Sequence, residues 1–218
     1  ACRGTSPIHC VRGACGTATT GRRGAMSGPG RLWLPGLVHD PSPNADDRPA
    51  ECAVDLLVIH NISLPPGEFG GGYIADLFQN RLDPAVHPYF AEIAHLHVSA
   101  HLLVRRNGDA IQFVALDRRA WHAGPSNHCG RERCNDFSIG IELEGSDDAR
   151  FSAAQYRRLC DLTREIQALF PAITTQRIVG HSDIAPGRKT DPGPNFDWGR
   201  YHAELTRLAQ NTPLICDN

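Results

Sequence analysis

The chain has 218 residues, of which 41% are hydrophobic and 21% are charged. This length can bury a sizeable core, and the composition is typical of one globular domain. No stretch approaches the roughly 18 consecutive apolar residues of a transmembrane helix, so we expect no membrane partner. The net charge is −2, and residues 26–218 alone carry 18 basic and 24 acidic residues. An acidic domain is a poor match for phosphate groups, which argues against a nucleic-acid partner.

Residues 1–30 differ in composition from the rest of the chain. Residues 1–25 are rich in Gly, Thr, Ala and Arg, contain no acidic residue and show no apolar periodicity. They include no apolar run of about 7–15 residues, so we find no secretory signal and expect a cytoplasmic protein. Because Met26 is the only methionine, we interpret residues 1–30 as a non-native or disordered extension. We expect residues 31–213 to form one folded domain and residues 214–218 to form a tail.

The cysteines after residue 25 number five, which is an odd count for a set of disulfides. A domain of this length does not need disulfides, and we expect reduced thiols. Cys129 and Cys134 lie close together in the sequence, but no second CxxC pair accompanies them, which argues against a cysteine zinc site.

The first half of the domain begins with an irregular, proline-rich segment at Leu32–Ala50. Val54–His60 is a short continuous apolar run, which predicts a buried central strand that ends at His60. Asn61–Gly72 contains two prolines and four glycines, so it is predicted to be a loop. Ile74–Asn80 is compatible with a short helix.

Two more strands are predicted at His97–Arg105 and Ala110–Leu116, and Asn107-Gly108 between them is a strong signal for a tight hairpin turn. Arg119–Asp136 reads as a polar loop. Ser138–Leu143 is again apolar and strand-like.

The clearest helix is Ser152–Phe170, which begins with a capping-box pattern that pairs its first residue with Gln155. Arg177–Gly180 is predicted to be a short strand, Ser182–Phe196 a second Gly/Pro-rich loop, and Asp197–Gln210 a last helix with its first residue as N-cap. Helices and strands are interspersed, and one strand pair is a hairpin. This pattern predicts an α/β (α+β) fold with a single mixed β-sheet flanked by helices.

Two loops directly follow predicted strand ends, after His60 and after Gly180. In open α/β sheets, binding sites collect at such strand ends. The chain contains no HExxH motif, and local spacing alone is weak evidence for a metal.

Five blocks of sequence resemble the AmpD-type N-acetylmuramoyl-L-alanine amidases, within the amidase and peptidoglycan-recognition superfamily. The resemblance runs from about residue 41 to residue 201. The blocks are His60–Gly70, Val98–His101, Ala120–Gly124, Gly130–Gly145 and Arg188–Pro194.

The resemblance implies that His60, His181 and Asp191 are zinc ligands, with one Zn²⁺ per chain. Two imidazoles and a carboxylate leave one tetrahedral position open, as a catalytic zinc requires. By the same resemblance Glu142 is the catalytic acid/base, although Glu144 lies on the same face of the strand, and Lys189 is a cation that stabilises the oxyanion.

Substrate binding is the predicted role of four further residues. Arg133 is a candidate clamp for a substrate carboxylate because its guanidinium can bind one in bidentate fashion. Trp121, His122 and Tyr89 are candidates for the walls of a sugar or peptide groove. For each of these residues the alternative is a structural role, either in core packing or at the protein surface. His95, His97 and His101 alternate along a predicted strand, and we expect a structural role for them.

The implied reaction is hydrolysis of the amide that joins the lactyl group of (1,6-anhydro-)N-acetylmuramic acid to L-alanine, during peptidoglycan recycling in the bacterial cytoplasm. The expected partner is a small-molecule muropeptide, and we expect a monomer. Three alternatives remain: a secreted or phage-type amidase that cuts intact wall, a peptidoglycan-recognition module without activity, and a hydrolase that uses a cysteine with a histidine.

Overall fold

The computed structural model describes residues 31–210, so the predictions for residues 1–30 and for the tail lie outside the described residues. Its centre is a six-stranded sheet with the strand order β1-β5-β4-β9-β3-β10. The β4–β5 pair is antiparallel and the other pairs are parallel, which confirms the mixed sheet. The strands are β1 (Val38–His39), β3 (Leu56–Ile62), β4 (Leu102–Val104), β5 (Ala110–Gln112), β9 (Ser138–Glu144) and β10 (Ile178–Gly180).

Two short antiparallel pairs lie outside this sheet. They are β2 (Ala45–Asp47) with β6 (Arg118–Ala120), and β7 (Asn127–His128) with β8 (Arg131–Glu132). The α-helices are α1 (Tyr73–Phe78), α2 (Pro88–Ile93), α3 (Ala153–Leu169), α4 (His181–Ile184) and α5 (Trp198–Gln210). The 3₁₀ helices are η1 (Cys134–Asp136) and η2 (Thr175–Arg177).

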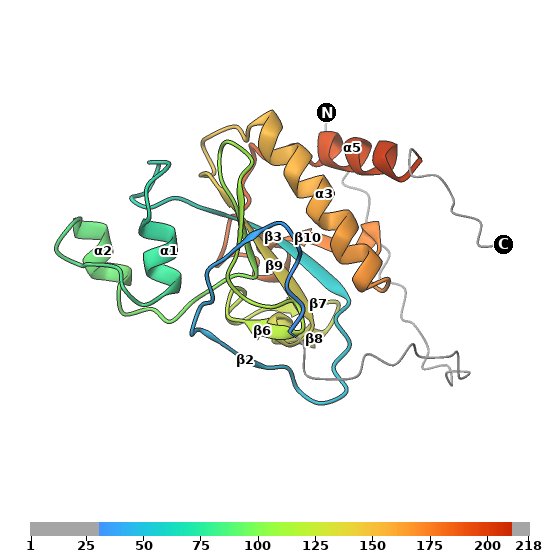
Figure 1. Ribbon diagram of the computed structural model, residues 1–218, viewed down its shortest axis with the longest axis horizontal. Coiled ribbons are helices and arrows are strands. Elements are labelled where there is room, and N and C mark those ends of the chain that lie inside the picture. The colour runs from blue at the N-terminus through green and yellow to red at the C-terminus, as the bar shows by residue number, and fades with distance from the viewer. Residues whose placement is uncertain (1–30, 211–218) are drawn as a thin grey trace. The chain divides into compact units, whose positions relative to one another are not determined.

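One face of the sheet is covered by α3 and α5, which lie together in Figure 1. Successive side chains of a strand point to opposite faces, so alternate apolar residues of β3 and β9 reach these helices. The resulting core is fully buried and joins the strands to the helices. Its members include Leu57, Ile59, Ile139, Ile141, Tyr156, Leu159, Ile166, Tyr201 and Leu205.

The opposite face of the sheet carries a second apolar cluster and the polar residues of β3 and β9. Leu77, Phe78 and Phe90, from α1 and α2, pack with Leu103 of β4 in this cluster. Figure 1 shows α1 and α2 side by side, away from α3 and α5. By the alternation of side chains along a strand, His60 and Glu142 belong to this face. They lie opposite each other in the β3–β9 register. The sheet therefore has one purely structural face and one face available for chemistry.

Most of the predicted elements are present, with shifted ends. The predicted strand at His97–Arg105 is shorter than expected, because only Leu102–Val104 pairs as β4. The residues before it hydrogen-bond to loops instead: Ser99 N–H donates to the Trp121 carbonyl, and Ser99 Oγ donates to the Asn44 carbonyl. His95 and His97 are therefore not on a strand.

Helix α2 was not predicted from the sequence. The His87 side chain accepts a hydrogen bond from Tyr89 N–H at 3.1 Å and caps the helix, and Pro88 occupies the first turn. Histidine is an uncommon N-cap, so this start lacked the usual Ser, Thr, Asp or Asn signal. The irregular lead-in and the polar loop likewise contain the short strands β1, β2, β6, β7 and β8.

The thiols follow the prediction in part. Cys52, Cys134 and Cys160 are free, and the last two are buried. Cys129 is disulfide-bonded, so the expectation of reduced thiols is wrong for that residue.

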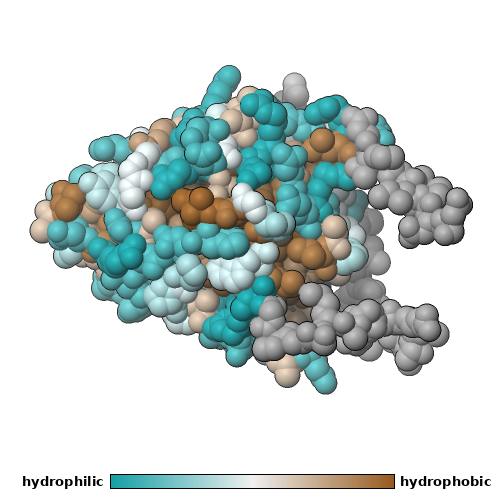
Figure 2. Space-filling view, in the orientation of Figure 1, coloured by the Kyte–Doolittle hydropathy of each residue, from teal (hydrophilic) through white to brown (hydrophobic). Residues whose placement is uncertain are grey.

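On the face drawn in Figure 2, hydrophobic residues are interspersed with hydrophilic ones. Within residues 31–210, no helix combines the length and the apolar character needed to cross a membrane.

Helix α3 begins with the predicted capping box. Ser152 Oγ accepts from Gln155 N–H at 3.1 Å, and the Gln155 side chain accepts from Ser152 N–H at 3.0 Å. Ser152 Oγ also donates to the Arg106 carbonyl at 2.6 Å, which ties the helix to the β4–β5 hairpin.

Replacing Ser152 with alanine removes the cap, and we expect the free energy of unfolding to fall by about 1 kcal/mol. Ser152→Thr keeps the hydroxyl and should retain most of that stability. Urea denaturation of the three proteins measures the difference. Equal losses in both variants would show that the hydroxyl is not the stabilising group.

Candidate metal centre and active site

Three side-chain atoms converge near the carboxyl ends of the neighbouring parallel strands β3 and β10. His60 is on β3, and His181 is the first residue of α4, directly after β10, which runs parallel to β3. Asp191 comes from the loop after α4. His60 Nδ1, His181 Nδ1 and Asp191 Oδ2 lie 3.0 Å from one another in all three pairings. His60 and His181 are buried, and the Asp191 side chain is only 14% exposed.

The surroundings of His181 indicate what this cluster can hold. His181 Nε2 lies 3.0 Å from the Ala123 carbonyl, which can only accept, so Nε2 carries the ring proton of the neutral form. His181 Nδ1 then presents a lone pair to Asp191, whose carboxylate also only accepts. Two acceptors therefore face each other with no proton between them, and a cation that binds both atoms removes their repulsion. Three atoms at these separations can all lie about 2.0–2.2 Å from one ion, the range for zinc with histidine and carboxylate.

The charges of the cluster agree with a cation site. Burial lowers the pKa of His60 to about 4, so its imidazole is neutral at physiological pH and free to act as a ligand. Burial alone would raise the pKa of Asp191, but its close polar contacts with His181 and His60 outweigh burial, and the pKa lies below the usual range. Two neutral imidazoles and a carboxylate are the protonation states that metal binding requires.

Glu142 lies beside the cluster on β9 and is 9% exposed. Its Oε2 has no hydrogen-bond partner among the described residues, which is unusual for a buried carboxylate oxygen. Burial raises its pKa well above the ordinary value, and the nearby negative charge of Asp191 acts in the same direction. A buried acid with a raised pKa, open to a cavity, is suited to act as a general acid or base.

A cavity of about 320 Å³ contains the cluster and Glu142. Trp121, His122, Tyr89 and Lys189 also line it. Its other wall is apolar and comes from α1, α2 and the segment after α2. The apolar lining residues include Leu77, Phe78, Ile93, Leu96 and Val98. The cavity thus offers a polar reaction centre next to a hydrophobic surface.

Arg133 does not line this cavity. Its side chain is 70% exposed, and its guanidinium pairs with Asp136 at 3.2 Å. A role for Arg133 in substrate binding stays a prediction.

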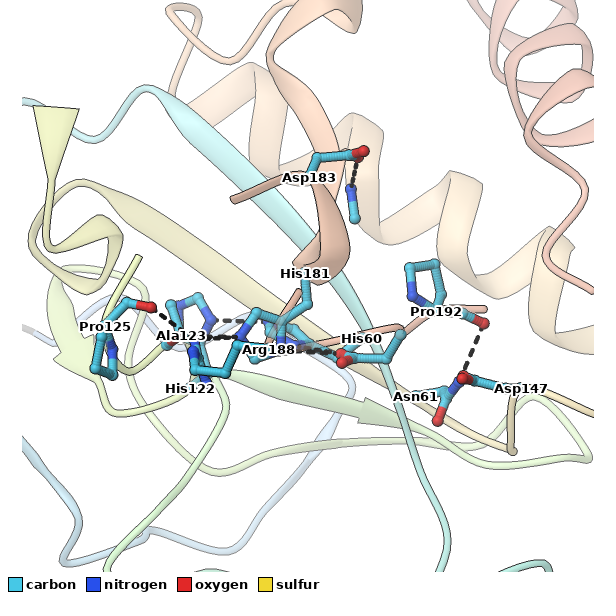
Figure 3. Close-up of polar contacts among 12 residues, drawn as sticks. His60, Asn61, His122, Ala123, Pro125, Asp147, His181, Asp183, Arg188 and Pro192 are labelled. Carbon is cyan, nitrogen blue, oxygen red and sulfur yellow. Dashed lines mark hydrogen bonds and ion pairs between the residues drawn. The ribbon is translucent and has the colours of Figure 1, made fainter. Parts of the chain in front are cut away.

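Two residues that support the site were not singled out from the sequence. Asn61 Nδ2 donates to Asp147 at 2.8 Å and to the Pro192 carbonyl at 3.0 Å, so it connects β3 to the loop that carries Asp191. Arg188 donates to the carbonyls of Ala123 and Pro125 at 2.6 and 2.7 Å. Figure 3 shows these contacts around His60 and His181. Their partners are distant in sequence, and most are backbone atoms, so residue types gave no signal.

The sheet, the two-histidine, one-aspartate cluster and the buried glutamate are together the features of a metal-assisted hydrolase. Residues 50–194 match the model of the N-acetylmuramoyl-L-alanine amidase family. The chain belongs to this family, which confirms the resemblance seen in the sequence.

Individual relatives agree. The chain is 59% identical over 174 residues to the 1,6-anhydro-N-acetylmuramyl-L-alanine amidase AmpD of Enterobacter cloacae, covering 80% of this chain and 92% of the relative. A crystal structure of a selenomethionine derivative of AmpD superposes with a TM-score of 0.77 at 57% identity, covering 78% of this chain and 95% of that one. Escherichia coli AmiD, in complex with anhydro-N-acetylmuramic acid-L-Ala-D-γ-Glu-L-Lys, superposes with a TM-score of 0.51 at 32% identity, covering 74% of this chain and 65% of AmiD.

Behind the cavity lies His101, which is fully buried. Its Nδ1 accepts from Gly140 N–H at 3.0 Å, so its Nε2 carries the proton and donates to the Arg118 carbonyl at 3.0 Å. Burial, with the positive charge of Arg48 as the second cause, lowers the pKa of His101 to about 3.

This lowered pKa predicts acid sensitivity. The unfolded chain binds a proton at His101 below about pH 6.5, whereas the folded chain does not until about pH 3, so stability falls as the pH drops through this window. Between about pH 6.5 and pH 5 the loss from this residue is about 2 kcal/mol. Urea denaturation of wild type and His101→Asn at both pH values measures it. The variant should lose less stability than wild type, and identical losses would contradict the assignment.

Proposed function

We propose that this protein hydrolyses the amide between the lactyl group of 1,6-anhydro-N-acetylmuramic acid and L-alanine, with a zinc ion held by His60, His181 and Asp191. The observation that carries the proposal is the convergence of these three ligand atoms beside the unpartnered oxygen of Glu142, in a chain of the amidase family. A relative that is 59% identical to this chain bears the name of this activity, which supports the anhydro sugar as substrate.

Zinc, when bound, supplies a Lewis acid for the amide carbonyl and for water. The remaining chemistry belongs to the chain. Glu142 takes a proton from the attacking water at its free oxygen and returns it to the nitrogen of the leaving L-alanine. Lys189 lines the same cavity and offers its ammonium group to the negative charge that develops on the carbonyl oxygen, an electrostatic effect often worth about 3 kcal/mol.

The substrate would lie across the cavity. Trp121 and Tyr89 are the proposed contacts for the sugar and peptide, next to the apolar wall from α1 and α2. A soluble muropeptide needs no macromolecular partner, so we propose a monomer that acts in cytoplasmic recycling. Release of peptide from intact peptidoglycan at an equal or higher rate would favour a wall-cutting amidase instead.

Asp191→Ala tests the metal centre. The variant removes one of three ligands, and we expect wild type to contain about one zinc per chain and the variant to contain little, with peptide release from anhydromuramyl peptide abolished. Mass spectrometry of the metal content and chromatography of the released peptide measure both. Asp161→Ala, at an exposed position on α3, is the matched control and should behave like wild type. A metal-free wild type that still cleaves would overturn the mechanism.

Glu142→Gln tests the proton transfer separately from metal binding. The amide keeps the size of the side chain but cannot accept the proton, so kcat/KM should fall by about 10²–10⁴-fold. Zinc content should stay at the wild-type level, because Glu142 is not a proposed ligand. Glu165→Gln, exposed on α3, controls for the change of charge. Full activity in Glu142→Gln would move the role of the base to another residue.

A further inference from the structure

The second ring nitrogen of His60, Nε2, faces away from the proposed metal centre and has a partner of its own. His60 Nδ1 faces His181 and Asp191, whereas His60 Nε2 lies 2.9 Å from His122 Nδ1. The two rings meet edge to face, with centroids 5.0 Å apart. On the far side of the second ring, His122 Nε2 lies 3.1 Å from Ser138 Oγ. His60, His122 and Ser138 therefore form a continuous chain of polar contacts that leads away from the proposed metal centre.

The donors and acceptors in this chain have one consistent arrangement. A metal bound at His60 Nδ1 uses the lone pair there, so the ring proton is on Nε2 and is donated to His122 Nδ1. His122 Nδ1 is then an acceptor, and its own proton is on Nε2, where it is donated to the Ser138 hydroxyl. Each histidine is neutral, and each ring nitrogen in the chain has a partner.

The fold fixes the position of the His122 ring. Ser138, Gly140 and Glu142 alternate along β9 and share one face of the sheet. A Cβ atom at Gly140 would come within 2.6 Å of His122 Cγ and Nδ1, so only glycine leaves room for the ring there. The backbone N–H groups of His122 and Ala123 both donate to Asn135 Oδ1, at 3.2 and 2.8 Å, which holds the segment from the other side.

We propose that His122 is a positioning residue for the metal centre: it accepts a hydrogen bond from His60 Nε2–H and so fixes the tautomer and orientation of that ring. His122 is itself oriented by Ser138 and by the space above Gly140. This role rests on the proposed function, because it requires a metal at His60. It differs from the substrate contact expected from the sequence. Partners of this kind commonly change metal affinity by about 10–100-fold.

The test compares two substitutions of similar shape. His122→Asn places an amide oxygen near the position of Nδ1 and keeps an acceptor for His60, whereas His122→Leu has the same branching without an acceptor. Zinc dissociation constants are measured by competition with a chelator at neutral pH. We expect about 10–100-fold weaker zinc binding in His122→Leu and recovery of most of the affinity in His122→Asn.

A second readout reports the tautomer directly. In zinc-loaded wild type, nitrogen-15 NMR should show a protonated Nε2 on His60, with its proton protected from exchange. That protection should be lost in His122→Leu and retained in His122→Asn. Ser138→Ala, which frees the far end of the ring, should weaken zinc binding by less than His122→Leu does. Thermal unfolding of the metal-free proteins shows whether both variants are folded.

The outcomes separate the two proposals. Wild type that binds no zinc overturns the metal centre itself. Tight binding in wild type with equal affinities in the Asn and Leu variants, whether both unchanged or both weakened, overturns the role of His122 as an acceptor and leaves the metal centre intact. Zinc binding that is weak in His122→Leu and close to the wild-type affinity in His122→Asn supports the positioning role.

Discussion

The arrangement of this molecule depends on holding three electron-rich atoms 3.0 Å apart: two imidazole nitrogens and a carboxylate oxygen. Lone pairs at this separation repel one another unless a proton or a cation lies between them, so the surrounding structure must keep them together. The parallel β3–β10 pair sets the spacing of His60 and His181. Asn61 donates to the Pro192 carbonyl and to Asp147, and its bond to Pro192 holds the loop that carries Asp191.

The two faces of the sheet have different roles, one in stability and one in the candidate active site. The face under α3 and α5 is a continuous apolar core, and burial of such residues is the main source of folding free energy. The other face carries buried polar groups, among them His101, His60 and Glu142, which cost free energy unless they are paired. The apolar face therefore supplies the free energy that keeps these polar groups buried. Glu142 Oε2, which faces the cavity, has no hydrogen-bond partner within residues 31–210.

Local patterns in the sequence predict the parts of the fold that local forces determine. The capping box of α3, the apolar runs of β3 and β9 and the turn at Asn107-Gly108 follow from propensity and periodicity. The proposed metal ligands and the proposed role of Glu142 came only from the family resemblance, because His60 and His181 are 121 residues apart in the chain. The sequence gives no sign that Arg133 lies outside the cavity.

The supporting contacts are hidden from the sequence for a different physical reason. Arg188 binds carbonyl groups of the backbone, and every residue has one, so no residue type marks the partner. The space that Gly140 leaves for His122 depends on how β9 packs against the segment after β6, which no local pattern in the sequence reports. Helix α2 begins with an unusual cap, which propensity rules do not anticipate.

The Ala123 carbonyl accepts hydrogen bonds from both His181 and Arg188, and its segment also contains Trp121 and His122 of the cavity wall. A backbone oxygen keeps this role through substitutions that preserve the path of the chain, but not through a change in the number of residues. Inserting or deleting one residue between Trp121 and Pro125 would shift the register by about 3.5 Å, more than the length of a hydrogen bond. Insertions and deletions in this segment are therefore expected to be far less tolerated during evolution than point substitutions at its exposed positions.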